Sequence, residues 1–336
     1  MQIPTKLKYA LAVSATGLLA FILAQVAISA DPDVRLGQAQ AQLRWCQDLQ
    51  TQATTDAEHE WANHCVDLAK RLVDSLSPTQ SPSVSASTTT SDAPAGCLAK
   101  PSQCGYPDAT NTGVPAETGL TVVNGDMKIA TDDAVVEGKE IHGCVTVAAK
   151  NVTIRKTKIV GACYYMAEVT SGDATLDQVE INCTQAGTGI ANSNLSVHHA
   201  NIHGCENGLD VGSDVTVEDS WIHDVYNGGT AHGDGIQTDD NGTGVLFKHN
   251  TIVNPGGTSA IITARNGTVG TRIENNLLDG GAYTVYCPYN SATNFQLANN
   301  RFGVGYTYGP MTACDKAYVT ATGNVWDASG QPVPVG

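Results

Sequence analysis

The sequence predicts an all-β protein whose main domain is a right-handed parallel β-helix, a solenoid in which each turn of the chain stacks on the previous one. Short β-branched runs, each ended by Gly, Asn or Asp, recur with central apolar residues 18, 22, 21, 20, 30, 26 and 24 positions apart. No amphipathic helical pattern separates these runs, which is typical of a solenoid of short strands. The central residues, called marker residues below, are Ile141, Ile159, Ile181, Ile202, Ile222, Ile252, Leu278 and Phe302.

Two other repeat-rich or β-rich folds were weighed against this one. A β-sandwich also has short strands and turns, but it does not need a repeating register. A leucine-rich repeat protein would show a leucine frame, which this sequence lacks. We therefore expect the marker residues to stack in one interior column, on strands that pair in parallel.

The composition limits the classes of function. The chain has 336 residues, with 33 Asp and Glu against 18 Lys and Arg and a formal charge of −15. This acidic excess argues against nucleic-acid binding, because phosphate recognition needs clustered Lys and Arg. Hydrophobic residues make up 41% of the chain, which is enough for a core and excludes wholesale disorder.

Residues 1–30 have the pattern of a signal peptide or a signal anchor. Lys6 and Lys8 precede an uncharged run that ends in small residues before Asp31. This order predicts either secretion with cleavage after Ala30 or retention by a membrane anchor. Both alternatives place the rest of the protein at the cell surface or outside the cell, and contact with a membrane is expected only through this segment if it stays uncleaved.

The next two segments precede the solenoid. Residues 31–76 carry apolar residues at helical spacing and predict an α-helical hairpin, in which Cys46 and Cys65 face each other and form a disulfide. Residues 77–96 are almost entirely Ser, Thr, Pro and Ala, which predicts a flexible linker. The β-helix domain is expected to span residues 97–336.

Ten cysteines, an even number, fit an oxidising compartment. Adjacent turns of a β-helix lie about 4.8 Å apart, so cysteines at similar places in successive repeats are within reach of each other. The sequence has no Cys-x-x-Cys pair, the spacing that would favour a metal site over disulfides. The expected bridges in the solenoid are Cys97–Cys104, Cys144–Cys163, Cys183–Cys205 and Cys287–Cys314.

Three stretches carry a resemblance to a known family: CLAKPSQCGYPDATNTGVP at residues 97–115, VTVAAKNVTIRKTKI at 145–159 and HGDGIQTDD at 232–240. With the repeat frame, they resemble secreted actinobacterial β-helix proteins of the pectate-lyase-like superfamily over residues 97–336. That superfamily contains lyases, hydrolases, epimerases and non-catalytic surface proteins, so the resemblance implies the fold and leaves the reaction open. The polygalacturonase motifs Gly-Asp-Asp, Gly-His-Gly and Arg-Ile-Lys are not found in order here.

An acidic window marks the place where we expect function. Between Ile159 and Phe247 there are 13 Asp and Glu, five His and no Lys or Arg. The repeat also lengthens here, through Gly-rich segments at residues 227–233 and 241–244. Loops inserted in a solenoid usually gather on one face and form its binding surface. We therefore expect a groove in this window, centred on residues 232–240.

The candidate residues follow from this location and from strand alternation. An outward Trp beside carboxylates, imidazoles and an amide offers a sugar an apolar platform and directional hydrogen bonds. Turn chemistry and polar stacking in a β-helix are the competing explanations for the same residues. The expected catalytic residues are His232, Asp234, Asp239, Asp240 and Arg265. The expected substrate-binding residues are Asp210, Trp221, His223, Tyr226 and Gln237. The expected Ca²⁺ ligands, if the cation is used, are Asp210, Asp234 and Asp239.

Three functions remain open for a protein whose partner is a polysaccharide or a cell-surface glycan. A polysaccharide lyase acting on an acidic glycan would need a cation to neutralise the uronate and a base such as His232 or Arg265. A glycoside hydrolase would need two carboxylates, for which the window offers several pairs. A non-catalytic surface protein would need only the binding face.

Overall fold

A computed structural model describes residues 96–335, apart from 186, 230, 264–267 and 289–291, and residues 43–44, 46–47, 50, 62, 65–66 and 69–70. The chain divides into two compact units, Met1–Ala93 and Pro94–Gly336, which are described separately. The described residues of the first unit are helical, and a disulfide joins Cys46 to Cys65. The expected signal segment, and the expected linker apart from Gly96, lie outside the described residues. No helix in the described part of the chain is long and apolar enough to span a bilayer.

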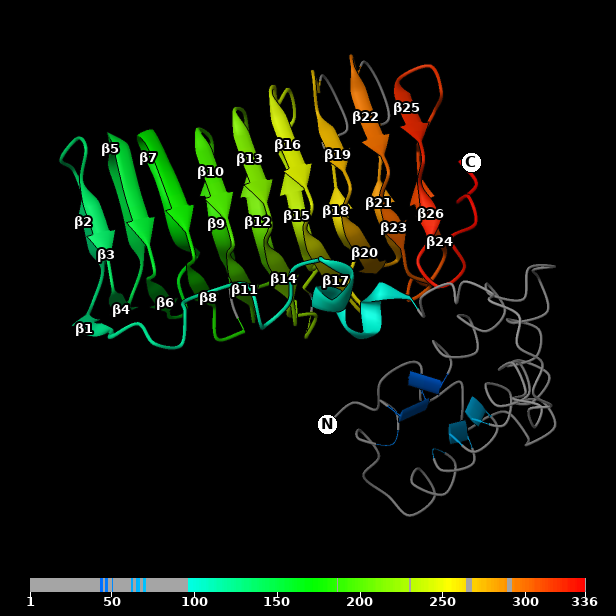
Figure 1. Ribbon diagram of the computed structural model, residues 1–336, viewed down its shortest axis with the longest axis horizontal. Coiled ribbons are helices and arrows are strands. Elements are labelled where there is room, and N and C mark those ends of the chain that lie inside the picture. The colour runs from blue at the N-terminus through cyan, green and yellow to red at the C-terminus, as the bar shows by residue number, and fades with distance from the viewer. Residues whose placement is uncertain are drawn as a thin grey trace, which may run out of the picture. The chain divides into compact units, whose positions relative to one another are not determined.

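The second unit is a parallel β-helix whose turns form two stacked sheets (Figure 1). One sheet, called sheet A, has ten strands in the order of the chain. Its strands are β1 (Thr121–Asn124), β4 (Lys139–His142), β6 (Lys158–Val160), β8 (Glu180–Asn182), β11 (Asn201–His203), β14 (Trp221–His223), β17 (Thr251–Asn254), β20 (Leu277–Gly280), β23 (Arg301–Phe302) and β26 (Val325–Trp326).

The second sheet, called sheet B, has sixteen strands in two columns, and two long strands, β5 (Val145–Arg155) and β7 (Tyr165–Asp177), belong to both columns. The first column continues with β2 (Met127–Ile129), β9 (Thr188–Asn192), β12 (Asn207–Val211), β15 (Asp234–Thr238), β18 (Ser259–Ile262), β21 (Tyr283–Tyr286) and β24 (Gly309–Thr312). The second column continues with β3 (Val135–Glu137), β10 (Leu195–His198), β13 (Val215–Glu218), β16 (Val245–Lys248), β19 (Arg272–Glu274), β22 (Phe295–Ala298) and β25 (Val319–Thr322).

The marker residues confirm the predicted register. Each one pairs in parallel with the next, from Ile141 opposite Ile159 to Leu278 opposite Phe302. All eight are 0% exposed. Burying an aliphatic side chain of this size contributes about 1.5–3 kcal/mol, so this column is a main source of the stability of the solenoid.

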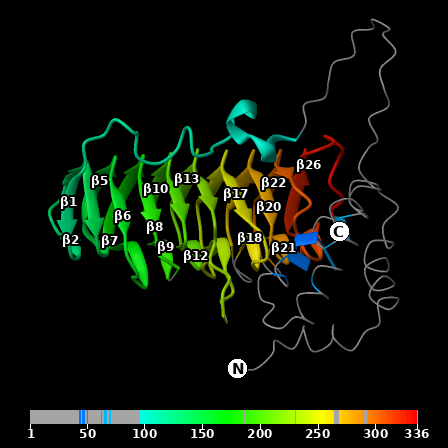
Figure 2. The ribbon, with the colours of Figure 1, turned by 90° about the horizontal axis from the view of Figure 1, so that it is seen from below.

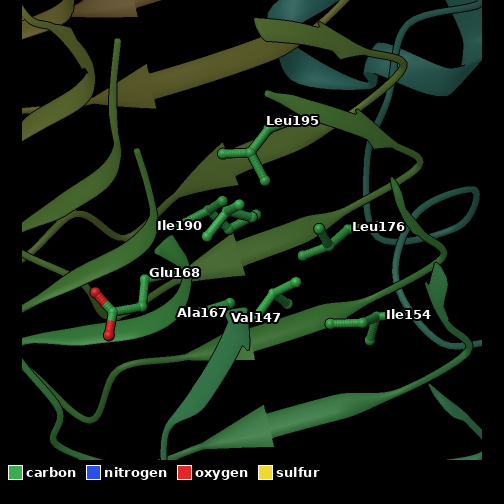
Figure 3. A pocket seen from close by; sticks show the side chains of 8 residues that line it. Val147, Ile154, Ala167, Glu168, Leu176, Ile190 and Leu195 are labelled. Carbon is green, nitrogen blue, oxygen red and sulfur yellow. The ribbon is translucent and has the colours of Figure 1, made fainter. Parts of the chain in front are cut away.

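The interior of the solenoid is filled by apolar side chains from all three strands of each turn. Figure 3 shows one such region, where Val147, Ile154, Leu176, Ile190 and Leu195 point toward one another. These five residues are 0–2% exposed. The space between them is part of a packed core, and Glu168 is the one charged residue among those that line it.

A ladder of buried asparagines supports the corner between the second column of sheet B and sheet A. Asn250, Asn276 and Asn300 each donate a side-chain N–H to the next asparagine and another to a carbonyl of sheet B. Asn324 ends the ladder and donates to the carbonyl of Leu297 at 2.7 Å. Buried amides that are fully paired in this way hold the corner in one conformation.

The solenoid is preceded by a segment that runs along it (Figure 2). Two short 3₁₀ helices, η1 (Cys97–Ala99) and η2 (Pro101–Cys104), begin this segment near the last turns, where the Leu98 N–H donates to Asp327 at 3.0 Å. The ring of Tyr106 then stacks on His249 with centroids 5.1 Å apart. Further along, the Gly113 N–H donates to the His199 carbonyl at 2.8 Å. The segment therefore contacts late and middle turns before the chain enters the first turn.

The four disulfides predicted for the solenoid are all present, and the described part of the chain has no free cysteine. Their Cα–Cα distances are 4.7–5.9 Å, as expected for neighbouring turns or a tight local loop. The pairs are Cys97–Cys104, Cys144–Cys163, Cys183–Cys205 and Cys287–Cys314.

Candidate functional site

The first column of sheet B carries a polar stack on its outer side. Asp210 on β12 lies directly beside Gln237 on β15 in the parallel register. The residues that precede them on these strands, Leu209 and Ile236, are 0% exposed and point into the core. Because side chains alternate along a strand, Asp210 and Gln237 point away from the core, as the sequence predicts.

Asp239 lies next to Asp210, and the two are called the acidic pair below. The Asp239 N–H donates to the Val211 carbonyl at 2.8 Å, which fixes Asp239 at the end of β12. Gly212 lies beside it: a Cβ there would be at an ordinary contact distance of 3.6 Å from Asp239 Oδ2, but it would collide with Ser193 Oγ. Asp239 is exposed, whereas Asp210 is half-buried and its Oδ1 has no hydrogen-bond partner among the residues that the structure describes.

The two carboxylates of the acidic pair have different environments. Burial, followed by the negative charge of Asp239, raises the pKa of Asp210 to about 6. Asp210 therefore keeps its proton closer to neutral pH than an ordinary aspartate does. A perturbed carboxyl beside an exposed one is a common sign of a functional site.

A tyrosine that the sequence analysis missed lies close to this pair. Burial raises the pKa of Tyr165, and the charges of Asp210 and Asp239 contribute to the same rise. Its ring packs edge-on against Tyr164, which is 79% exposed, with centroids 4.6 Å apart. The available signal was the Tyr-Tyr pair at the start of a repeat in a chain with only 11 tyrosines.

Asp234 is not a surface carboxylate, which corrects the expectation of an exposed position in a groove. It is 3% exposed, its Oδ1 accepts a hydrogen bond from Ser259 Oγ at 2.5 Å, and its N–H donates to Asn207 Oδ1 at 3.0 Å. Burial raises its pKa to about 7, although the hydrogen bonds of Ser259 act in the opposite direction. Asp234 therefore belongs to a buried polar stack at the beginning of β15.

The glycines beside Asp234 are explained by packing. A Cβ on Gly235 would collide with Ile252 and with the carbonyl of Ala260, and one on Gly233 would collide with Asn227. These glycines therefore let neighbouring segments of the solenoid approach each other closely.

Trp221 and His223 lie on sheet A, whereas Asp210 and Gln237 lie on sheet B. This corrects the expectation that the four residues share one face. The rings of Trp221 and His223 stack with centroids 3.4 Å apart, and His203 stacks on His223 at 5.2 Å. Burial lowers the pKa of His223, whose Nδ1 is 2.8 Å from Asp224 Oδ2. These rings form a separate stack on sheet A.

The other candidate residues have varied positions. His232 and Asp240 are exposed, and the His232 N–H donates to Glu206 Oε1 at 3.4 Å. Tyr226 is half-buried in the segment between β14 and β15, where its N–H donates to the Cys205 carbonyl at 2.7 Å. Arg265 lies outside the described residues.

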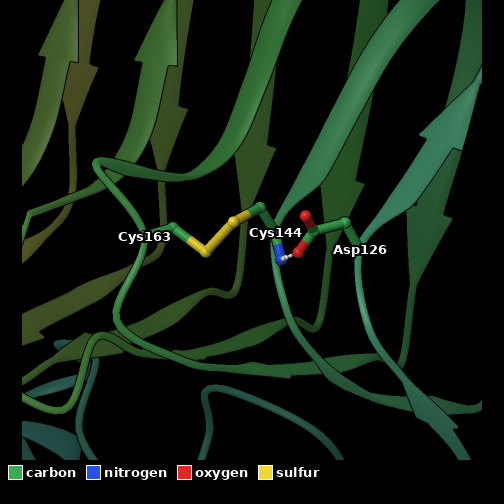
Figure 4. A group of neighbouring side chains, drawn as sticks. All are labelled: Asp126, Cys144 and Cys163. Atoms are coloured by element: carbon green, nitrogen blue, oxygen red, sulfur yellow. Dashed lines mark hydrogen bonds between the residues drawn. A yellow bond between two sulfur atoms is a disulfide. The ribbon is translucent and has the colours of Figure 1, made fainter.

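Within the described part of the chain, Asp210, Asp234 and Asp239 do not bring ligand atoms within 4.8 Å of one another. The group that meets this criterion is Asp126, Cys144 and Cys163. Figure 4 shows why it is not a metal centre: the two sulfur atoms are bonded to each other, and Asp126 accepts the Cys144 N–H at 2.9 Å. The expectation of Ca²⁺ at these residues stays a prediction.

Comparisons with known proteins address the fold. The family described as "Right handed beta helix region" matches residues 122–278 and agrees with the predicted handedness. A solved structure of the tailspike protein gp49 from Acinetobacter baumannii bacteriophage Fri1, described as a capsular polysaccharide depolymerase, aligns at 10% identity with a TM-score of 0.26. The alignment covers 62% of this chain and 53% of that chain, so it spans about half of the tailspike's length. The search of curated proteins finds no match.

Proposed function

We propose that this protein is an extracellular glycoside hydrolase in which Asp210 is the general acid and Asp239 is the second carboxylate. The observation that supports this most strongly is the raised pKa of Asp210, about 6, beside an exposed carboxylate on the outer side of sheet B. Hydrolysis of a glycosidic bond needs one carboxyl that keeps its proton and one that is ionised. The acidic pair places a carboxyl with a raised pKa beside an exposed carboxyl, on adjacent turns.

Each residue has a role in the proposed reaction. Asp210 donates its proton to the glycosidic oxygen as the bond to the leaving sugar breaks. Asp239 assists the attack on the sugar carbon from which that oxygen departs, directly or through water. Gln237, which lies beside Asp210 in the register, offers amide hydrogen bonds to sugar hydroxyls.

Lyase chemistry on an acidic glycan, one of the three functions that the sequence leaves open, has weaker support at this face. A uronate must have its charge neutralised before its C5 proton can be removed. The sequence from residue 160 to residue 246 has no Lys or Arg, so it supplies no permanently cationic side chain for that purpose. An acidic face without a bound cation repels a polyuronate and does not repel a neutral glycan.

The test uses the purified secreted chain with xylan, galactomannan, hydroxyethyl cellulose and polygalacturonate. The wild type should release reducing ends from a neutral polysaccharide without forming the ultraviolet-absorbing unsaturated product of a lyase. Asp210→Asn should lower the rate by about 100-fold or more, the usual contribution of a general acid. Asp214→Asn, the same change at an exposed position, is the matched control and should keep the rate.

Three results would contradict the proposal. An unsaturated product from polygalacturonate would show that the protein is a lyase. Retention of a polysaccharide without any product would show that it is a binding protein. Full activity in Asp210→Asn would place the catalytic acid elsewhere.

A further inference from the structure

Three tyrosines gather at the C-terminal end of the face that carries the acidic pair. Tyr283 and Tyr286 lie at the two ends of β21, and their rings pack edge-on with centroids 5.4 Å apart. Tyr308, just before β24, packs against Tyr283 at 5.7 Å and is 71% exposed. The group, called the tyrosine platform below, presents aromatic rings to solvent in a chain of low aromatic content, 6%.

The backbone that carries the platform is held by hydrogen bonds and a disulfide. Gly309 leaves room for the ring of Tyr283, because a Cβ there would lie 3.3 Å from that ring. The carbonyl of Tyr286 accepts hydrogen bonds from the N–H and the hydroxyl of Thr263, at 3.0 and 2.8 Å. The next residue, Cys287, is bonded to Cys314. A backbone that is held in place before a ligand arrives loses little conformational entropy on binding.

The register connects the platform to the acidic pair. Along the outer side of the first column, Asp210 pairs with Gln237, Gln237 with Ile262, and Ile262 with Tyr286. Three steps of about 4.8 Å place Tyr286 about 14 Å from Asp210 along the axis of the solenoid. Tyr165, on β7, lies on the opposite side of Asp210 in the order of the strands. Aromatic rings therefore lie on both sides of the acidic pair along one face.

We propose that the tyrosine platform is a sugar-stacking subsite for a neutral polysaccharide that lies along the solenoid axis and is cut internally at the acidic pair. This inference rests on the proposed hydrolase function and adds the class of substrate and the mode of cleavage. Sugar rings have apolar faces that pack on aromatic rings, and a tyrosine hydroxyl adds a hydrogen bond at the edge. A chain bound at the platform and at the acidic pair continues past the acidic pair toward Tyr165, so cleavage falls within the chain.

The test compares Tyr308→Ala with Tyr308→Phe, which keeps the aromatic ring and serves as the matched control. Tyr308 is mostly exposed, so neither change should disturb folding. Binding is measured by retardation in native gels that contain xylan, galactomannan, hydroxyethyl cellulose or polygalacturonate. Loss of one stacking ring should weaken binding of a neutral polymer about 3- to 10-fold, and Tyr308→Phe should bind as the wild type does.

Kinetics supply a readout that a general structural defect would not give. Tyr308→Ala should raise KM for the polymer more than KM for a short oligosaccharide of the same sugar, since only the polymer reaches the platform from the acidic pair. The wild type should lower the viscosity of the polymer early in the reaction, before many reducing ends appear. Release of small products from a chain end without that fall in viscosity would overturn internal cleavage.

The failure of this inference is distinguishable from failure of the proposed function. Equal gel retardation and equal KM in wild type and Tyr308→Ala, with Asp210→Asn inactive, would overturn the platform and leave the hydrolase proposal standing. Preferential binding of polygalacturonate would overturn the neutral substrate class. A wild type that neither binds nor cuts any of the four polysaccharides would overturn both proposals.

Discussion

Replacing Asp234 with Asn removes the titrating carboxyl of a residue that is only 3% exposed. The folded chain holds the pKa of Asp234 at about 7, and the ordinary value for the unfolded chain is 3.8. Between these two pH values the folded state keeps a proton that the unfolded state has released. The stability linked to this proton is therefore fully present below pH 3.8 and is lost as the pH rises to about 7.

The size of the effect follows from the shift in pKa. A difference of about 3 pH units, at ~1.4 kcal/mol per unit, corresponds to about 4 kcal/mol of stability lost by the wild type above pH 7. About 3 kcal/mol of this falls between pH 5 and pH 8, since about 2 of these units lie above pH 5. Asp234→Asn is neutral throughout and can still accept the hydrogen bond of Ser259. Its new N–H group costs about 1–3 kcal/mol if it finds no acceptor, and that cost does not depend on pH.

The assay is thermal unfolding of the full chain, with its disulfides intact, followed by calorimetry at pH 5 and pH 8. From pH 5 to pH 8 the melting temperature of Asp234→Asn should rise by about 6–12 °C relative to the wild type, at roughly 2–4 °C per kcal/mol for a domain of this size. Asp210 titrates in both proteins, so its contribution largely cancels in the difference. Asp214→Asn, at an exposed turn, should show no such relative change.

The reasoning would be refuted by a difference in melting temperature that is the same at both pH values. That result would mean that Asp234 is ionised in the folded protein across this range. It would also require a cation or a solvent path near Asp234.

Two further predictions concern the reaction and the core. The rate of hydrolysis should fall as the pH rises through about 6, because Asp210 must be protonated to act as the acid; a rate that continues to rise up to pH 8 would contradict this role. Ile202→Asp should destabilise the protein by several kcal/mol, because it buries an unpaired charge in the marker column. Ile202→Val is the control, with an expected cost of about 1 kcal/mol. A wild-type melting temperature in Ile202→Asp would contradict the register.

The register of the solenoid could be predicted from sequence because it is set by a periodic apolar signal. The longest step, from Ile222 to Ile252, did not disturb it, since the extra residues lie at corners while the strands stay aligned. Cys183 and Cys205 could be paired for the same reason: their distance from the marker residues placed them on adjacent turns. Periodic burial and disulfides between adjacent turns both follow from the spacing of residues along the chain.

The asparagine ladder was also visible in the sequence, although the analysis did not use it. Asn250, Asn276 and Asn300 each stand two residues before a marker residue. An isolated asparagine at the end of a strand suggests a turn, because its side chain bonds to nearby backbone. Here the same residue type bonds to the next turn of the solenoid instead, which becomes evident only when the copies are aligned.

Asp234 could not be placed from its own strand. Alternation along a strand predicts a direction for each side chain, but it does not tell whether the chain elsewhere covers that position. The segment between β14 and β15 brings Asn227 against Gly233, beside Asp234, and Ser259 comes from the following turn. With Asn207 of the preceding turn, which accepts the Asp234 N–H, the burial of this carboxyl is therefore a property of three turns together.

A comparison of the pKa values of Glu180 and Asp210 shows how the absence of Lys and Arg from residues 160–246 affects a carboxyl. Glu180 lies within this stretch, but a hydrogen bond from His203 and an ion pair with Lys158 at 2.7 Å lower its pKa to about 2. Among the described residues Asp210 has no such partner, and burial beside Asp239 raises its pKa to about 6. One solenoid thus holds two partly buried carboxyls at opposite protonation states near pH 5, and the difference depends on whether a basic side chain is within reach. A lysine placed beside Asp210 would remove its capacity to donate a proton, so the lack of basic residues in this window is what an acid catalyst on this face requires.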